Sequence, residues 1–317
     1  MTSIRRYIAN NSWLWAALAS LLLWLVMGIT ANRLNLESFI SNAYTATFLA
    51  LLAYGQMLVI TSGRGAIDLS IPGVLTLMAF ISMTIINGVS ANIPLALIVV
   101  LVISLFIGFL NSVLVIYLRI PAIIGTMAMN YILTTAALLI NRNFQIFAIA
   151  PVLKTILLGR FLGIPYMIII MILFSLILWL ALNKTPYGRS LMAIGQNIEA
   201  AKLAGVKVVK TEMITYMLSS AFAGISGILI SARVGGALLG MGDSYTMETI
   251  ASVVVGGTFI SGGKASVQGT LVGCFFLGIT VTAMQLLGMS IGVQRIAKGL
   301  IIIFVVFIGT FQNKLTR

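Results

Sequence analysis

The stretch LSIPGVLTLMAFISMTIINGVSANIPLALIVVLVISLFIGFLNSVLVIYL, residues 69–118, contains no charged side chain and decides the fold. A membrane-spanning helix needs about 20 mostly apolar residues, so this stretch is long enough for two of them. Its interior segment NGVSANIP, residues 87–94, combines Gly, Asn and Pro, which favour turns. The stretch therefore predicts two membrane helices joined by a short turn.

The other gaps between charged residues predict the rest of the architecture. Only 8% of the 317 residues are charged and 60% are hydrophobic, whereas a soluble domain has about 25% charged residues. We therefore predict an all-α integral membrane protein of about ten transmembrane helices, folded as a single transmembrane domain over residues 1–317. The first span is long and lacks a clear cleavage site, so we expect a retained helix rather than a signal peptide. The spans outside residues 69–118 are 7–32, 38–63, 120–141, 161–183, 213–232, 249–263, 265–294 and 299–313.

The composition excludes several classes of function. The chain has no His and a single Cys, Cys274, so it cannot form a Ser-His-Asp triad, a zinc site of His and Cys ligands, or an intramolecular disulfide. We predict no catalytic residue and no metal site. The net charge of +13 lies in loops between spans and forms no basic face, so we expect no nucleic-acid partner.

The distribution of Lys and Arg predicts the orientation in the membrane. The loop 184–212 is the most basic part of the chain, and basic loops stay in the cytoplasm. With ten spans, both termini then lie in the cytoplasm as well. The basic residues of this loop are Lys184, Arg189, Lys202, Lys207 and Lys210.

Two glycine-rich interruptions suggest an internal repeat. The span 38–63 runs into SGRGA, residues 62–66, and the span 249–263 runs into SGGKA, residues 261–265; each is followed by a return to apolar sequence. Paired interruptions are typical of inverted repeats, here spans 2–5 and 7–10, with non-helical backbone lining a pathway. The alternative is that the glycines only allow close helix packing.

Polar side chains at the depth of the spans are candidates for the translocation pathway. Acidic residues inside a membrane are usually functional, and Asp68 and Glu248 are the acids that we expect nearest the membrane. The alternatives are that the uncharged residues form interhelical hydrogen bonds and that the acids cap helices or pair with Arg64 or Lys264. The candidates are Gln56, Asp68, Asn111, Thr126, Asn130 and Glu248.

The loop segment GQNIEAAKLAG, residues 195–205, predicts an isolated helix of about two turns. Asn197 is a favourable N-cap, Glu199 suits the first turn, and Gly205 is a favourable stop. A helix this short is not stable alone, and its small side chains suit a groove of a partner protein. The alternative, a helix lying on lipid headgroups, requires a larger apolar face.

The segment EAA, residues 199–201, followed by Gly205, resembles the coupling loop of ABC importer permeases. The surrounding sequence is similar to the ribose-type branch of these permeases. The residues TPYGR at 185–189 and AIGQN at 193–197 carry this similarity within the loop. GAIDLS at 65–70 and YTMETIASVVVGGT at 245–258 carry it elsewhere, with departures at Arg64, Pro72, Thr246 and Ala265.

The resemblance implies a multi-pass permease subunit of the bacterial inner membrane, which forms the pathway for a small polar solute, expected to be a monosaccharide. It implies three partners: an ABC ATPase subunit, an extracytoplasmic solute-binding protein and a second permease, identical or different. The chain has no phosphate-binding loop, because GGKA at 262–265 lacks the required Gly and Ser or Thr. We therefore expect no enzyme activity and no cofactor, with ATP bound by the partner. The implied coupling residues are Asn197, Glu199, Ala200, Ala201, Lys202 and Gly205.

Two other functions are compatible with a protein of many spans. An ion-gradient-driven secondary transporter explains the spans and the repeat without partners, but it needs a relay of buried carboxylates, for which we expect only Asp68 and Glu248. A membrane scaffold has no positive signal in the sequence.

Overall fold

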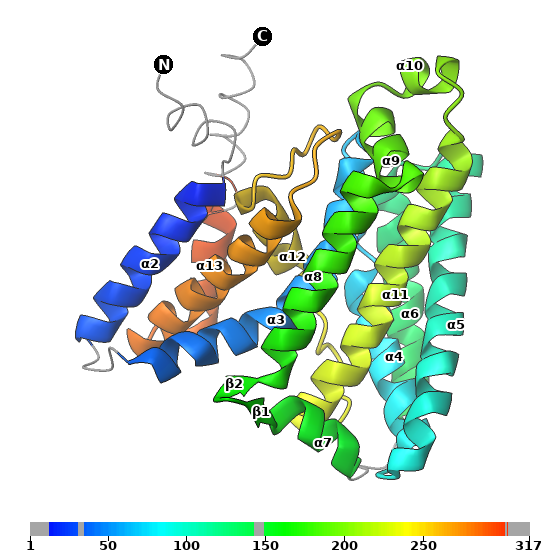
Figure 1. The fold of residues 1–317 in the computed structure, drawn as a ribbon. Helices are drawn as coiled ribbons and strands as arrows, with labels where there is room; N and C mark the ends of the chain where they lie inside the picture. Colours follow the sequence, from blue (N-terminus) through cyan, green and yellow to red (C-terminus); the bar gives the residue numbers. More distant parts are fainter. Residues whose placement is uncertain (1–12, 31–34, 143–148, 302, 304–317) are drawn as a thin grey trace, which may run out of the picture.

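The computed structural model describes residues 13–30, 35–142, 149–301 and 303. These residues fold almost entirely into helices, many of which run side by side in a bundle (Figure 1). The long helices are α2 Trp13–Thr30, α3 Leu36–Thr61, α5 Ile93–Ser112, α6 Ala122–Asn141, α8 Tyr166–Lys184, α11 Val208–Val234 and α13 Val267–Leu286. The shorter elements are α4 Ile71–Ile86, η1 Ser90–Asn92, η2 Val113–Tyr117, α7 Pro151–Leu158, β1 Arg160–Phe161, β2 Ile164–Pro165, α9 Pro186–Gln196, α10 Ile198–Leu203 and α12 Tyr245–Val255, followed by a helix over residues 291–301.

The helices of the described residues confirm an all-helical membrane architecture but not the expected number of about ten spans. Six are long and apolar enough to cross a membrane: α3, α5 with its flanking turns, α6, α8, α11 and α13. Three more, α2, α4 and α12, are apolar but shorter. Most of the tenth predicted span, 299–313, lies outside the described residues, as do both termini.

The short helices α4 and α12 explain part of the difference. The 11 residues of α12 cover about 16 Å, roughly half of an apolar membrane layer of about 30 Å. The predicted span 249–263 is in fact the end of α12 together with non-helical residues. Apolar residues occur both in membrane helices and in buried loops. The length of the charge-free stretch therefore does not show where the helix ends.

The start of the seventh span was also predicted incorrectly. Helix α11 begins at Val208 rather than at residue 213, and it includes Glu212, whose exposed fraction is 3%. The prediction treated this charged residue as the limit of the span. A charge can lie inside a buried helix when a partner compensates it, and the sequence alone does not show that partner.

Helices α3 and α11 form the centre of the bundle. The apolar windows of these two helices are 83% and 67% buried, against 28%, 28% and 22% for the α5, α6 and α8 spans. Small residues allow close approach to α11: a Cβ on Gly55 of α3 would lie 3.0 Å from the Cα of Ser219, and one on Gly108 of α5 would lie 2.5 Å from the Cα of Met217. The outer helices therefore present many exposed apolar side chains, as expected of helices that face lipid.

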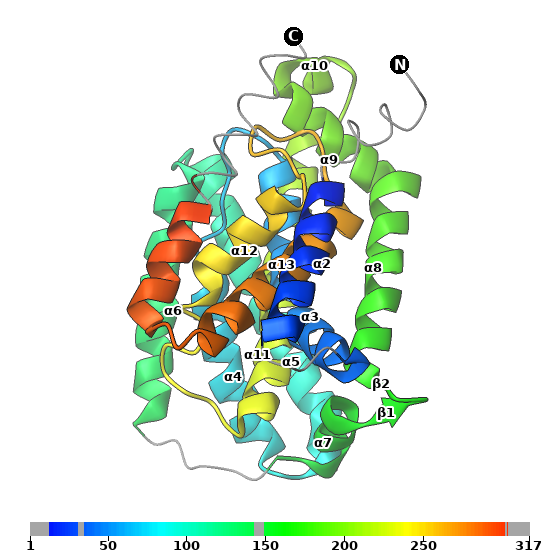
Figure 2. The same ribbon diagram turned by 90° about the vertical axis from the view of Figure 1, so that its left-hand side faces the viewer.

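The two ends of the bundle differ. Helices α9 and α10 project from one end, which we call the coupling end, and α7 and the β1–β2 hairpin lie at the other (Figure 1). Residues 62–70, between α3 and α4, form what we call the first break; residues 256–266, between α12 and α13, form the second break. Figure 2 shows that the α11–α12 connection, residues 235–244, instead leaves α11 at the end opposite to α10.

The two breaks meet at the coupling end, where a Cβ on Gly262 would lie 2.3 Å from the Cα of Gly63. The two-fold axis of an inverted repeat lies in the membrane plane and places equivalent segments at opposite ends. The expected pairing of these two breaks as equivalents in such a repeat is therefore wrong. The similar segments SGRGA and SGGKA instead lie in contact with each other.

Candidate coupling and pathway site

The short helix α10 has the local structure that the sequence predicts. The side-chain oxygen of Asn197 accepts hydrogen bonds from the backbone N–H groups of Glu199 and Ala200, both at 3.0 Å. The Lys202 ammonium lies 2.8 Å from the Glu199 carboxylate. Gly205 ends the helix with φ at +78°, a left-handed conformation that glycine adopts without strain. These contacts make α10 a capped, well-defined projection.

The two faces of α10 have different environments. Ala201 has an exposed fraction of 4% and packs with Ile194 and Val208, which attach the helix to α9 and α11. Leu203, on the other face, is 91% exposed. Of the predicted coupling residues, Ala201 thus points toward its own chain, whereas Asn197, Glu199, Ala200, Lys202 and Gly205 are exposed. Leu203 was not predicted, although it is the largest apolar side chain in the exposed part of this helix.

Gly195, near the end of α9, lies against both breaks. A Cβ on Gly195 would lie 2.0 Å from the carbonyl oxygen of Thr61 and 2.3 Å from the backbone nitrogen of Gly263. The N–H of Gly263 donates to the oxygen of Thr61 at 2.9 Å, and the amide of Gln196 donates to the oxygen of Gly263 at 3.4 Å. We call this contact of α9 with the two breaks the glycine junction. It places the start of the α10 segment directly on both interruptions of the bundle.

The deeper part of the first break surrounds Asp68, which is 3% exposed. One carboxylate oxygen accepts hydrogen bonds from the backbone N–H of Ser70 at 2.9 Å and its hydroxyl at 2.6 Å. The other accepts from the hydroxyl of Ser219 on α11 at 2.7 Å. Ser219 lies about 16 Å along α11 from its first residue, so the first break descends well into the bundle.

Two other pathway candidates converge on the same segment. The amide of Asn111 on α5 donates to the Ser70 hydroxyl at 2.8 Å. The hydroxyl of Thr126 on α6 accepts from the N–H of Leu69 at 2.9 Å. Asp68, Asn111 and Thr126 therefore belong to one polar cluster, which also includes Ser70 and Ser219. The two serines were missed because nothing in the sequence distinguishes them from serines that bond to their own helix.

The remaining pathway candidates lie elsewhere. Gln56 on α3 is fully buried, and its amide atoms have no hydrogen-bond partner among the described residues. Asn130 on α6 packs against Gly73 of α4, whose Cβ would lie 2.7 Å from the Asn130 side-chain oxygen. Glu248 pairs with Lys298 at 2.6 Å. The structure thus brings three of the six candidates together and leaves three apart.

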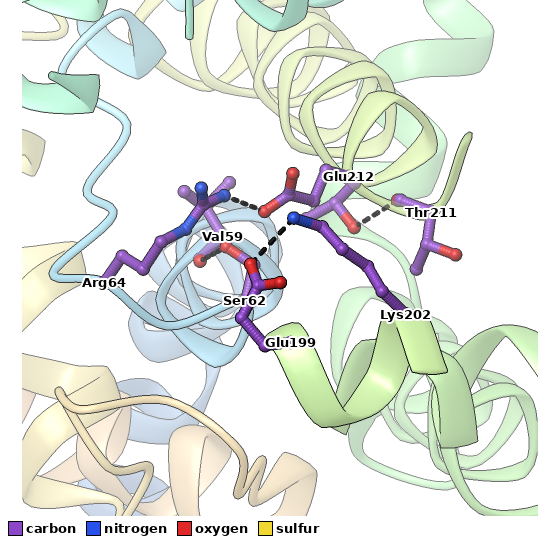
Figure 3. Close-up of polar contacts among 8 residues, drawn as sticks. Val59, Ser62, Arg64, Glu199, Lys202, Thr211 and Glu212 are labelled. Carbon is purple, nitrogen blue, oxygen red and sulfur yellow. Dashed lines mark hydrogen bonds and ion pairs between the residues drawn. The ribbon is translucent and has the colours of Figure 1, made fainter. Parts of the chain in front are cut away.

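Glu212 is the charged residue that the sequence analysis overlooked. Its buried carboxylate forms an ion pair with Arg64 of the first break (Figure 3). Asp68 and Glu248 are therefore not the only acids at the depth of the helices, and Arg64 pairs with neither of them but with Glu212. A basic residue inside a glycine-rich interruption was the available signal that a buried acid lies nearby.

The α11–α12 connection also reaches into the bundle. A Cβ on Gly242 would lie 2.3 Å from the carbonyl oxygen of Pro72, in the first turn of α4. The N–H of Gly242 donates to the Thr76 hydroxyl at 3.3 Å. The first break leads into α4 from the coupling end of the bundle. Residues 235–244 lead into α12 from the opposite end.

Helix α9 is fixed to α11 by a buried side-chain contact. The Tyr187 hydroxyl lies 3.0 Å from that of Thr215 on α11. Burial raises the pKa of Tyr187 to about 12, and the hydrogen bond to Thr215 partly offsets this effect. The phenol therefore stays neutral at physiological pH, and the position of α9 does not depend on its ionisation.

The fold and the site define a multi-pass helical membrane protein that carries an exposed, capped helix in contact with the interruptions of its bundle. The model of the branched-chain amino acid transport system permease component family matches residues 38–308. The chain therefore belongs to this permease family, which indicates a multi-pass protein of the inner membrane.

Similar relatives include sugar importer components. The chain is 34% identical to a ribose import permease protein of Bacillus subtilis over 81% of this chain and 80% of the relative. It is 31% identical to that of Escherichia coli K12 over 96% of both chains. It is 29% identical to an autoinducer 2 import system permease protein of Shigella flexneri over 98% of this chain and 91% of the relative. No solved structure matches.

These relatives confirm the resemblance on which the sequence analysis relied. They support a permease subunit of an ABC importer and not the ion-gradient-driven transporter considered as the alternative.

Proposed function

We propose that this chain forms the membrane pathway for a small polar solute, a monosaccharide, in an ATP-driven importer. The observation that carries the proposal is the exposed helix α10, joined through the glycine junction to both breaks in the bundle. The relatives that import ribose and autoinducer 2 support a small, hydroxyl-rich solute.

In this proposal a separate ATPase subunit binds and hydrolyses ATP, and the permease itself needs no cofactor and catalyses no reaction. The exposed face of α10, with Leu203 at its C-terminal end, contacts a groove of the ATPase. Because Ala201 and the Tyr187–Thr215 contact attach α9 and α10 to α11, a displacement of α10 moves the helices with it. Residues 184–212 act as the coupling loop, with Asn197, Glu199, Ala200, Lys202 and Gly205 presenting or terminating the contact helix.

We place the pathway where α4 and α12 begin. The order and lengths of the helices suggest an inverted repeat in which α3 to α6 correspond to α11, α12, α13 and the helix at 291–301. In this correspondence the first break is equivalent to residues 235–244, and both lead to a short helix that starts inside the bundle. The N-terminal ends of interrupted helices expose backbone N–H groups suited to polar solutes.

The assembly that we propose contains two permease subunits, ATPase subunits on the coupling end and an extracytoplasmic binding protein on the opposite end. The coupling end is then cytoplasmic, in agreement with the basic loop 184–212, and both termini are cytoplasmic as well. The chain contributes a single transmembrane domain over residues 1–317.

The test is ATP-dependent uptake by liposomes that contain the purified permease and its ATPase, supplied with the binding protein and labelled pentoses and hexoses. We expect uptake that requires ATP and the binding protein and persists in the presence of an ionophore. Uptake that proceeds without the ATPase and collapses with the ionophore would overturn the proposal. An ATPase variant without hydrolysis is the matched control.

A single substitution tests the role of α10. Leu203→Asp places a charge in the proposed contact, and we expect roughly tenfold weaker ATPase binding, as for the loss of a central apolar contact. Since Leu203 is 91% exposed, thermal unfolding of the isolated permease should not change. Leu162→Asp, at an 88% exposed apolar residue of the opposite end, is the control. Unchanged ATPase binding by Leu203→Asp would remove α10 from the contact.

A further inference from the structure

A row of four charged side chains leads from α10 to the first break. Lys202 pairs with Glu199 on α10 at 2.8 Å, and Glu212 pairs with Arg64. Figure 3 shows the Lys202 side chain extending toward the two carboxylates, and its ammonium also acts on Glu212 electrostatically. The signs alternate along the row, from Glu199 through Lys202 and Glu212 to Arg64. Charges of the coupling helix therefore adjoin charges of the bundle interruption.

The two members of the inner pair have unequal environments. The Glu212 side chain is 4% exposed, whereas that of Arg64 is 54% exposed. A buried carboxylate needs a compensating charge, so loss of the pair costs Glu212 more than it costs Arg64, which water can solvate. Loss of the pair therefore frees the residues around Arg64 and leaves the Glu212 carboxylate in need of a new partner, which Lys202 is placed to supply.

The backbone at Arg64 indicates that this pair helps to fix the part of the first break around Arg64, between the glycine junction and the Asp68 cluster. Gly63, Arg64 and Gly65 all have positive φ, at 86°, 58° and 67°. The left-handed conformation is unfavourable for Arg and persists only where other contacts impose it. A Cβ on Gly65 would meet nothing within 4 Å, so packing does not impose it at that position.

We propose that the Arg64–Glu212 ion pair is a latch that holds the first break against the base of α11, and that α10 controls it through Lys202. When the ATPase displaces α10, the Lys202 ammonium moves relative to the Glu212 carboxylate. If it moves closer, it competes with Arg64 for Glu212; if it moves away, Arg64 pairs with Glu212 without competition. The latch thereby links the state of the ATPase to the position of the first break. This inference rests on the proposed function, and it makes Arg64 and Glu212 positioning residues.

A double-mutant cycle tests the latch in the assembled transporter. Glu212→Gln removes the pair without leaving a buried charge, and Arg64 stays solvated. We expect uptake per ATP hydrolysed to fall by roughly tenfold, within the usual range of coupling between sites, while ATP hydrolysis without solute rises. Arg64→Gln alone leaves a buried, unpaired carboxylate and should be worse, and the double variant should match Glu212→Gln. Effects that multiply in the double variant would show that the residues act independently.

Matched controls separate a latch from a general loss of structure. Glu37→Gln removes an exposed ion pair with Arg160 at the opposite end and should leave coupling unchanged. If Glu212→Gln does not assemble with the ATPase, Lys202→Gln, at an exposed position, decides: we expect the same loss of uptake per ATP. Normal coupling in Glu212→Gln, or in Lys202→Gln where that variant decides, would overturn the latch. Absence of ATP-driven uptake by the unsubstituted transporter would instead overturn the proposed function.

Discussion

The first and second breaks have similar sequences and meet at the same end of the molecule, but they are held in place differently. The first break is bonded by side chains from three other helices, through Asn111 of α5, Thr126 of α6 and Ser219 of α11. The second break bonds mainly to itself: the N–H of Phe259 donates to the oxygen of Lys264 at 3.3 Å. The position of the first break therefore depends on side chains from several helices, whereas the second combines a turn of its own with the contacts of Gly262 and Gly263 at the glycine junction.

Close backbone packing anchors the second break more than polar side chains do. At its two ends, a Cβ on Gly269 of α13 would lie 1.8 Å from the oxygen of Gly256 at the end of α12. A Cβ on Gly273 would lie 2.1 Å from the oxygen of Ser252. The comparison implies that the second break is sensitive to the size of a side chain and the first to its polarity.

The largest effect should follow from a larger side chain at the second break. Gly269→Val forces α12 and α13 apart, and we expect a loss of about 3 kcal/mol or more in the free energy of unfolding. Thermal unfolding in detergent measures it. Gly292→Val is the control, because a Cβ on Gly292 would meet nothing within 4 Å. Equal stability of the two variants would contradict the role of packing.

A larger side chain at the glycine junction, where both breaks meet, should have a smaller effect on stability but a strong effect on uptake. Gly195→Ala places a methyl group against Thr61 and Gly263, and we expect a loss of about 1–3 kcal/mol in stability. Because the junction joins α9 to both breaks, ATP-driven uptake should fall more than stability alone explains. Gly236→Ala, at a position with open space around the Cβ, is the control. Uptake that only follows the amount of folded protein would show that the junction is structural.

The smallest effect should follow from a change of polarity without a change of size in the first break. Asp68→Asn replaces one of two accepting oxygens by an amide, and we expect a loss of about 1–2 kcal/mol, since a buried serine hydroxyl loses its acceptor. The same substitution at the exposed Asp243 should change stability by less than about 0.5 kcal/mol. If the two variants unfold at the same temperature, the polar cluster does not hold the first break.

Features that depend on neighbouring residues could be predicted from the sequence with good accuracy. The N-cap of Asn197, the stop at Gly205 and the presence of helices at most of the charge-free stretches follow from local chemistry, and the structure has them. The helix α4 ends at Ile86, at the turn that the sequence predicts over residues 87–94. The limits of α11 and α12 could not be predicted, because burial and ion pairing at a distance decide where those helices begin and end.

The site was also predictable only in part, because its residues can be identified one by one but their contacts join distant parts of the chain. Asp68, Asn111 and Thr126 were identified as polar residues at span depth, but the sequence does not show that they share one cluster. Glu212 was left out of the predicted span because a charged residue was taken to lie in water, outside the membrane. Arg64, far away in the chain, compensates its charge.

The sequence by itself determined that this is a helical membrane protein with a capped helix in a basic loop, because apolar length, charge and capping act over a few residues. Only the tertiary structure decided that both breaks meet beneath that helix and that Arg64 pairs with Glu212. Contacts of this kind depend on how distant segments pack, and glycine backbones and buried charges find their partners only when the bundle has formed.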